Sequence, residues 1–213
     1  MQQKEYIVDG LQVQEVDARF LETDLVRTAE LIDRHQPFVV LLTHYDDLLK
    51  TQHTLDYLLL SKLFGVPIGL AEDKLRMLQS EVDFRHIHVT YGKDIEAAID
   101  QIINVIVTLP DIREKYSKRY MAIRLLERPD EMLALLPHSD ELIRVANDQR
   151  SRLQMTYGMS AKEVIAHARR GFVHGALEET LTHARHDTGH SWADRIDKVL
   201  TNKWVGLPLL MLV

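Results

Sequence analysis

The sequence contains 213 residues, of which 46% are hydrophobic and 27% are charged, and its formal net charge is −6. These proportions are typical of a globular protein with one large domain or two small ones. The negative net charge excludes an overall basic surface, so we expect no nucleic-acid partner. The sequence has no cysteine, which excludes disulfides and thiolate metal sites, and its polar first ten residues show no signal-peptide pattern.

The first half of the chain alternates between helical and strand-like patterns. Apolar residues recur every three or four positions from Leu21 to Ile32, and PFVVLLT has the β-branched, apolar character of a buried strand. The predicted elements are a helix over 21–32, a strand over 37–43, a helix over 54–64 that Gly65 ends, a strand over 85–91 and a helix over 95–106. This order predicts an α/β fold with a parallel sheet covered by helices. Two or three strands leave the sheet incomplete, because a doubly wound sheet normally has five or six.

Beyond Pro110 the pattern is helical throughout, which predicts an all-α bundle. The predicted helices cover 112–127, 140–157, 160–181 and 191–204, with short helical turns near 129–136. Ser160 and Glu163 form the S-x-x-E pattern of a capping box, flanked by the apolar pair Met159 and Val164. Because these helices carry their own caps and apolar faces, we expect residues 109–190 to fold without the rest of the chain.

The stretch VVLLTHYDD places polar residues at the carboxyl end of the predicted strand, where ligands bind in open α/β sheets. Small GTPases carry an N-K-x-D motif at this point, and its aspartate accepts hydrogen bonds from the ring N–H and the amino group of guanine. Asp46 stands in the position of that aspartate, and Thr43 in that of the asparagine. An aspartate that only caps a helix or faces solvent is the alternative interpretation.

The sequence lacks the residue patterns that bind phosphate. No G-x-x-x-x-G-K-[ST] occurs, so no glycine-rich loop of that kind offers backbone N–H groups and a lysine to a diphosphate. No D-x-x-G occurs either, which removes the usual carboxylate beside Mg²⁺ and the γ-phosphate. We therefore expect no GTP hydrolysis by this chain.

Three histidines, His183, His186 and His190, are spaced so that a helix would place them on one face. Imidazoles in this arrangement bind divalent transition metals. The intervening D-T-G interrupts the helical pattern. The alternative, histidines in an exposed linker, is therefore the one we favour.

The last nine residues, 205–213, contain no polar side chain. Arg195, Lys198, Lys203 and Trp204 precede them. A membrane helix begins on its cytoplasmic side in this order, with cations first, then an interfacial aromatic residue, then an apolar run. The run is about half as long as a bilayer span, and a segment that packs into the protein core is the alternative.

Taken together, these segments resemble the cytoplasmic region of the bacterial ferrous iron transport protein B family. VDARFLETDLVRTAELI is similar to the family's V-D-A-x-N-L-E-R-N-L, THYDD to its guanine motif N-x-x-D, and TLDYLLLSKLFGVPI to its I-D-x-x-x-L-S-x-L-L-G-V-P-V. RYMAIRLLE resembles W-L-A-L-K-L-L-E, and WADRIDKVLTNKWVGLPLLMLV resembles the segment that leads into the family's first transmembrane helix. VTYGKDIEAAIDQI stands where the family has its second guanine-contacting loop, which implies contacts from Tyr91, Gly92 and Lys93.

The resemblance implies three regions. They are a partial GTPase-like domain without a P-loop over 1–108, a helical domain resembling a nucleotide-dissociation inhibitor over 109–190, and a juxtamembrane helix with the start of the first membrane span over 191–213. The chain would be a fragment or a degenerate form of the GTP-binding regulatory region of an Fe(2+) transporter. Its location would be the cytoplasmic side of the inner membrane, with the rest of the transporter as partner and Fe(2+) as the transported ion.

The family binds GTP or GDP with Mg²⁺. We expect this chain alone to retain neither the nucleotide nor GTPase activity, because it has neither the P-loop nor the D-x-x-G pattern. Thr43 in place of the motif's asparagine and Tyr91-Gly92 in place of a Ser-Ala pair should weaken guanine binding further. The competing hypothesis is a non-enzymatic pseudo-GTPase that docks on a membrane partner. A metal-binding module would rest only on the three spaced histidines.

Overall fold

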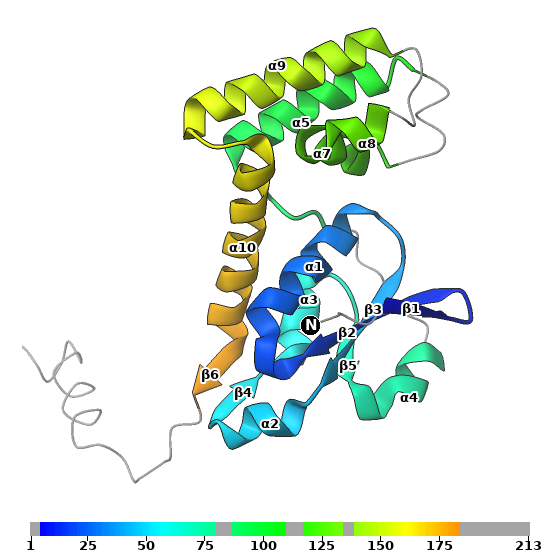
Figure 1. Cartoon of the computed structure of the whole chain (residues 1–213). Helices are drawn as coiled ribbons and strands as arrows, with labels where there is room; N and C mark the ends of the chain where they lie inside the picture. The colour runs from blue at the N-terminus through cyan, green and yellow to red at the C-terminus, as the bar shows by residue number, and fades with distance from the viewer. Residues whose placement is uncertain (1–4, 80–86, 110–116, 134–138, 184–213) are drawn as a thin grey trace, which may run out of the picture. The chain divides into compact units, whose positions relative to one another are not determined.

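A computed structural model of the chain describes residues 5–79, 87–109, 117–133 and 139–183 (Figure 1). The strands are β1 (Glu5–Val8), β2 (Leu11–Asp17), β3 (Phe38–Thr43), β4 (His53–Leu55), β5 (Ile68–Leu70) and β6 (Leu181–His183). The helices are α1 (Leu21–Asp33), α2 (Tyr45–Lys50), α3 (Tyr57–Phe64), α4 (Lys74–Gln79), α5 (Lys93–Ile106), α7 (Lys118–Glu127), α8 (Pro129–Leu133), α9 (Asp140–Tyr157) and α10 (Ala161–Thr180), with 3-10 turns η1 (Ala18–Phe20) and η2 (Ala71–Asp73). Residues 1–182 form one unit and 183–213 a second, and the description below concerns the first.

The main sheet has four strands in the order β1-β2-β3-β5. The pairs β2–β3 and β3–β5 are parallel, whereas β1 runs antiparallel to β2. The β1–β2 hairpin turns at Asp9 and Gly10, whose φ angles of 51° and 83° match the twist of a two-residue hairpin. The sheet is therefore mixed, with a parallel core and one antiparallel strand at its edge.

Helices cover both faces of this sheet. On one face Val16, Val40 and Leu42 pack in the main hydrophobic core with side chains from α1, α3 and α10. On the other face Val13, Val39 and Leu41 form a smaller core with Met77 and Leu78 of the short helix α4. The alternation of core side chains along β3 explains why its sequence is apolar at nearly every position.

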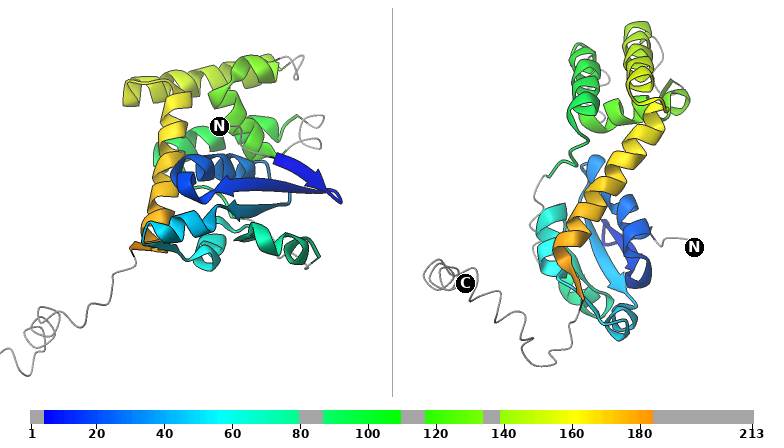
Figure 2. Two further views of the ribbon diagram at one scale, coloured as in Figure 1. Left: turned by 60° about the horizontal axis from the view of Figure 1, so that its bottom comes forward. Right: turned by 90° about the vertical axis from the view of Figure 1, so that its left-hand side faces the viewer.

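The second half of the described chain is helical. Helix α5 packs against α7 and α9, and it buries four isoleucines at helical spacing, Ile95, Ile99, Ile102 and Ile106. Helix α10 packs against α7 and α9 and also against α1 and α3 of the sheet region, so it lies beside both sets of helices (Figure 2). The predicted boundary at residues 108/109 stays a prediction, and α5 makes its main contacts with the helices beyond it.

A buried polar group connects these elements. The Arg169 side chain of α10 is 4% exposed, and it donates hydrogen bonds to Asp33, Tyr91 and Glu127. We call these four residues the Arg169 cluster. Burial raises the pKa of Asp33, and the Arg169 guanidinium and the Tyr91 hydroxyl counteract that rise. A charge at this depth is stabilised only with its partners in place, so the cluster fixes α10 against α1 and α7.

Most predicted elements are confirmed, including the α/β class followed by helices. Gly65 and Gly158 end α3 and α9 in the left-handed conformation (φ 63° and 70°), and both hydrogen bonds of the Ser160–Glu163 capping box are present. Two predictions are wrong. Residues 87–91 form no strand, and Leu55 lies in strand β4 rather than in a helix. The predicted helix over 191–204 and the apolar run 205–213 lie outside the described residues.

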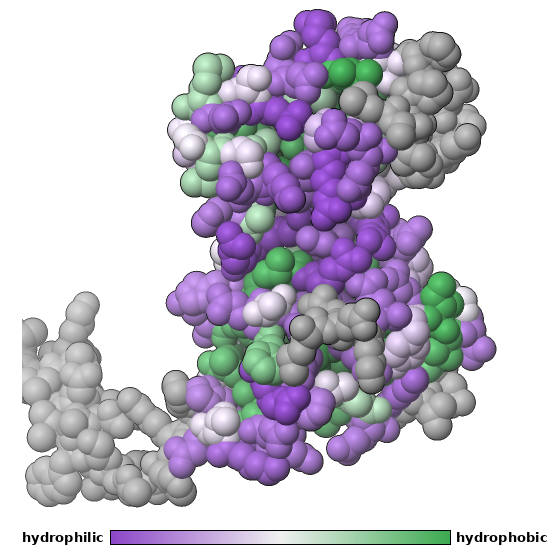
Figure 3. Space-filling model, in the orientation of Figure 1, coloured by the Kyte–Doolittle hydropathy of each residue, from purple (hydrophilic) through white to green (hydrophobic). Residues whose placement is uncertain are grey.

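The face drawn in Figure 3 is mainly hydrophilic, with small separate groups of hydrophobic side chains. One group lies over the β1–β2 hairpin, where Ile7 is exposed, and another over the end of α9, where Met155 is exposed. Within the ranges that the structure describes, no helix is both long enough and apolar enough to cross a bilayer.

Candidate functional site

The carboxyl ends of β3 and β5 meet at a hollow of about 350 Å³, which we call the β3–β5 hollow. Its lining residues are Leu42, Thr43, His44, Tyr45, Asp46, Asp47, Lys50, Leu70, Ala71 and Glu72. They come from the end of β3, from α2, and from the segment in which β5 runs into η2. The carboxyl ends of parallel strands are where open α/β sheets bind ligands, so this hollow is the candidate site.

Thr43 and His44 shape the turn from β3 into α2. The Thr43 hydroxyl donates a 3.4 Å hydrogen bond to the carbonyl oxygen of Val16 in β2, so it joins the two strand ends. His44 has a left-handed backbone (φ 55°), and its Nδ1 lies 3.4 Å from Oδ2 of Asp17. Histidine is one of the residues that adopt this conformation more readily than most. The turn directs the next residues of α2 toward the hollow.

The two carboxylates of α2 have different surroundings. Asp47 accepts a 2.8 Å hydrogen bond from Lys50, which holds the pKa of Asp47 below its ordinary value. Asp46 is exposed, and within the described part of the chain no side chain donates a hydrogen bond to it. Among the carboxylates that line the hollow, Asp46 and Glu72 are therefore the two whose oxygens are open to donors on a ligand, and Asp46 is the one at the end of β3.

The structure does not bring all predicted site residues together. Thr43 and Asp46 line the hollow, whereas Tyr91, Gly92 and Lys93 are not among its lining residues. Tyr91 is buried, and its side chain belongs to the Arg169 cluster. Gly92 and Lys93 are exposed at the start of α5.

Sequence reasoning missed Leu70, Ala71 and Glu72, which supply the second side of the hollow. They follow β5, a strand of three residues that was too short to stand out in the sequence. A signal was present, since IGLAED directly follows GVP, the end of the segment that resembles the family's sequence. The resemblance instead assigns the second guanine-contacting loop to TYGKD, which lies later in the chain than IGLAED.

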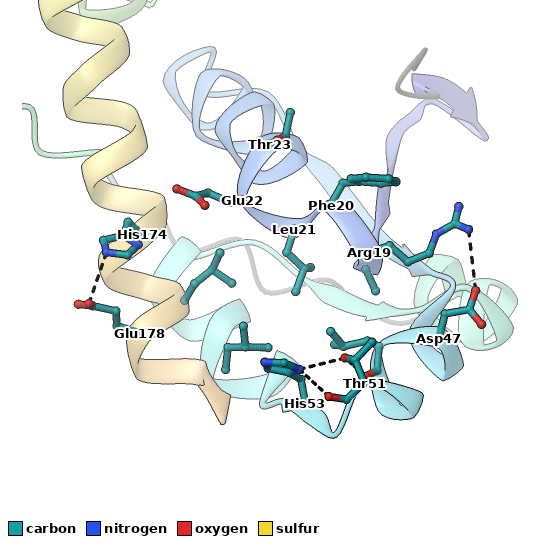
Figure 4. Close-up of a pocket in the computed structure, with 14 residues that line it drawn as sticks. Arg19, Phe20, Leu21, Glu22, Thr23, Asp47, Thr51, His53, His174 and Glu178 are labelled. Atoms are coloured by element: carbon teal, nitrogen blue, oxygen red, sulfur yellow. Dashed lines mark hydrogen bonds and ion pairs between the residues drawn. The ribbon is translucent and has the colours of Figure 1, made fainter. Parts of the chain in front are cut away.

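A second cavity, of about 710 Å³, lies where α2, β4 and α10 approach the start of α1. Figure 4 shows its labelled residues, with His174 and Glu178 on α10, His53 on β4, and Arg19 and Phe20 before α1. Its floor is apolar, from Leu21, Leu48, Leu177 and Leu181. Several charged groups at its rim already have partners: Arg19 pairs with Asp17, and His174 lies 3.4 Å from Glu178.

The described residues contain no cluster of three or more histidine, cysteine, aspartate or glutamate side chains that could hold a metal ion. Of the histidines singled out from the sequence, His186 and His190 lie outside the described residues, and only the backbone of His183 is described. The prediction about their metal binding stays a prediction.

Comparisons with known proteins show similarity to one family. A family profile described as "FeoB cytosolic helical domain" matches residues 91–182. Over 92% of its length the chain is 29% identical to the Fe(2+) transport protein A/Fe(2+) transporter FeoB fusion protein of Porphyromonas gingivalis, and over 93% it is 24% identical to the Fe(2+) transporter FeoB of Staphylococcus aureus. The chain is homologous to the cytoplasmic region of FeoB. It spans 25% and 31% of the lengths of these two FeoB relatives.

Solved FeoB structures share the fold. A mutant of S. thermophilus NFeoB bound to GDP matches with a TM-score of 0.69 at 22% identity, over 78% of this chain and 67% of that chain. S. thermophilus NFeoB bound to GDP·AlF4⁻ and K⁺ matches with a TM-score of 0.66 at 23% identity, over 76% of this chain and 66% of that chain. The sheet region followed by helices is thus the FeoB cytoplasmic fold.

Proposed function

We propose that this chain is a guanine-reading but phosphate-deficient form of the FeoB cytoplasmic region, acting in the regulation of a membrane Fe(2+) transporter. The β3–β5 hollow carries the proposal, because it places Thr43 and an open Asp46 carboxylate beside Leu70–Glu72 at the carboxyl ends of two parallel strands. Asp46 would accept hydrogen bonds from the guanine N–H and amino group. The backbone of Ala71 and Glu72, in place of Tyr91–Lys93, would close the other side of the base.

The residues present fit the base of the nucleotide but not its phosphates. Phosphate affinity in such proteins comes from glycine-loop N–H groups, a lysine and Mg²⁺, and the sequence contains no G-x-x-x-x-G-K-[ST] to provide the loop and its lysine. A charge-assisted contact such as the one from Asp46 contributes about 1.5–3 kcal/mol. Because a millimolar dissociation constant corresponds to about 4 kcal/mol, we expect GDP to bind this chain more weakly than millimolar.

The test has two parts. The full chain is titrated with guanosine and with adenosine while nuclear magnetic resonance records the shifts of the backbone amides, and it is titrated with GDP and Mg²⁺ in a calorimeter. Guanosine should shift the amides around 43–47 and 70–72 at concentrations of about 10 mM, while adenosine should not. Asp46→Ala should abolish these shifts. The matched control is Asp47→Ala, which removes the neighbouring carboxylate that is paired with Lys50.

Two results would contradict the proposal. Equal shifts with adenosine would show that Asp46 does not select the base. Micromolar binding of GDP in calorimetry would show that an unrecognised segment supplies phosphate contacts. The pseudo-GTPase alternative, in which the chain docks on a membrane partner without nucleotide, predicts no guanosine-specific shift at all.

We further propose that the chain works at the cytoplasmic side of the membrane, with the remainder of a transporter as its partner and Fe(2+) as the transported ion. The cation–tryptophan–apolar order from Arg195 to Val213 supports this proposal. Residues 109–190 would serve as the helical domain that slows nucleotide release. Flotation of the full chain with anionic lipid vesicles, compared with a chain ending at 183, tests the membrane attachment.

A further inference from the structure

Helix α2 is held between two non-glycine residues in the left-handed conformation. His44 precedes the helix with φ 55°, and Gln52 follows it with φ 61°. Histidine tolerates this conformation better than most residues, but glutamine has no such advantage. Positions of this kind persist only where the surrounding structure enforces them, and they gather at switch regions. The placement of α2 therefore stores backbone strain at its carboxyl end.

One hydrogen bond connects the β3–β5 hollow to the strand that follows α2. Tyr45 lines the hollow, and its hydroxyl donates a 3.0 Å bond to the carbonyl oxygen of Leu55 in β4. The Tyr45 ring also contacts the ring of Tyr57 edge-on, with the centroids 6.0 Å apart. A shift of α2 at the hollow would therefore displace β4 through this hydrogen bond.

Strand β4 in turn holds the carboxyl end of α10. It pairs with β6 in a sheet of only two strands. The Asp56 N–H donates a 2.8 Å bond to the Thr180 carbonyl oxygen, and the hydroxyls of Thr54 and Thr182 lie 2.7 Å apart. We call this pairing the β4–β6 clasp. Two-stranded sheets are marginally stable, so the clasp opens at low cost.

The neighbouring cavity leaves these elements room to move. Leu48 of α2, His53 of β4 and Leu181 of β6 all line the 710 Å³ cavity. Figure 4 shows α10 on one side of this space and the α2–β4 segment on the other. Helix α2 thus has backbone strain, a weakly stable neighbouring sheet and free volume beside it. Elements with low local stability of this kind are the ones that move between two positions.

We propose that α2 and the β4–β6 clasp form one conformational switch, in which the state of the β3–β5 hollow and the attachment of the end of α10 are coupled through the Tyr45–Leu55 hydrogen bond. This inference deepens the proposed function, and it rests on the proposed function only for the identity of the ligand that fills the hollow. Because coupling between two sites is reciprocal, a change at either end alters the other.

Hydrogen exchange of the backbone amides in the full chain, without nucleotide, tests the coupling. Tyr45→Phe keeps the ring but removes the hydroxyl, and it should speed exchange at 180–182 as well as at 53–55 by about fivefold, the effect of one lost hydrogen bond. Gln52→Gly relieves the left-handed strain and should slow exchange at the same amides. Thr182→Pro should speed exchange in 48–52. The matched control is Tyr57→Phe, which should leave the exchange at 180–182 unchanged.

The outcomes separate this inference from the proposed function. If Tyr45→Phe alters exchange at 53–55 only, or if Gln52→Gly has no effect at 180–182, the coupling is overturned whatever nucleotide binds. If the coupling is present but guanosine causes no Asp46-dependent shifts, the switch stands and the guanine proposal fails. Circular dichroism of each variant establishes that it is folded before the exchange rates are compared.

Discussion

The Tyr91 hydroxyl donates a hydrogen bond to the Asp33 carboxylate, 58 positions earlier in the chain. The same oxygen accepts a 2.9 Å bond from Nε of Arg169. One side chain that precedes α5 thus connects the end of α1 to the middle of α10. All three side chains are buried, so Asp33 and Tyr91 depend on each other and on Arg169 for polar partners, whereas Arg169 also pairs with Glu127.

Tyr91→Phe should lower the free energy of unfolding by about 1–3 kcal/mol, because it leaves a buried carboxylate and a buried guanidinium each short of one partner. Tyr6→Phe is the matched control. It removes a hydroxyl that bonds to Glu15 in a partly exposed position, and it should cost less than about 1 kcal/mol. Urea unfolding of the full chain measures both values. Equal losses for the two variants would contradict the importance of the Arg169 cluster.

Glu96 should make stability depend on pH. Burial raises the pKa of its carboxyl group, but hydrogen bonds from Arg119 and from the Tyr91 N–H lower it more, so the folded value lies below the ordinary 4.5. The unfolded chain then binds more protons than the native one in this range. The contribution of Glu96 is therefore present above pH 4.5 and is lost as the pH falls through the folded pKa. This contribution should vanish in Glu96→Gln. Urea unfolding of the variant and of the unchanged protein, at pH 7 and below pH 4.5, measures the effect. The two proteins should differ less in their free energy of unfolding at the lower pH than at pH 7.

Gly69→Ala should disturb the packing of α4 on the sheet. A Cβ at residue 69 would clash with Sδ of Met77, so the methionine must move. Because the clash involves the flexible end of a side chain, the expected loss is about 1 kcal/mol, at the low end for overpacking. A double-mutant cycle with Met77→Ala measures the interaction directly. Additive losses would mean that Met77 does not occupy this place in solution.

The sequence predicted that residues 109–190 fold alone, and the contacts of α5 lead us to revise that prediction. That fragment lacks α5, whose isoleucines pack against α7 and α9. We now expect a fragment of residues 109–183 to show weak, non-cooperative thermal unfolding, whereas a fragment of 87–183 should unfold cooperatively. Circular dichroism on heating distinguishes them. A cooperative transition in the shorter fragment would show that α5 is dispensable.

The sequence predicted those elements whose signals are local. The periodicity of Ile95 to Ile106, the glycine stops after α3 and α9, and the capping box at Ser160 each depend on residues within a few positions. The strand ending at Thr43 also followed from its own composition, and that located half of the candidate site.

What could not be predicted depends on pairing between distant segments. Strands β4 and β5 have three residues each, so their periodicity carries almost no information. The stretch RHIHVTY alternates like a strand, yet Tyr91 turns inward to Asp33 and Arg169, partners that lie 58 and 78 positions away. Leu70–Glu72 entered the site only because β5 pairs with β3.

Helix α10 contains 20 residues, and the 11 residue-to-residue steps from Arg169 to Thr180 span about 16 Å at 1.5 Å per step. A tilt of about 10° about the Arg169 cluster would displace Thr180 by about 3 Å, which is the length of a whole hydrogen bond. The Asp56–Thr180 bond could not survive such a displacement. The helix would therefore act as a lever arm: a small rotation among α5, α7 and α9 would become an all-or-none loss of the register between β4 and β6.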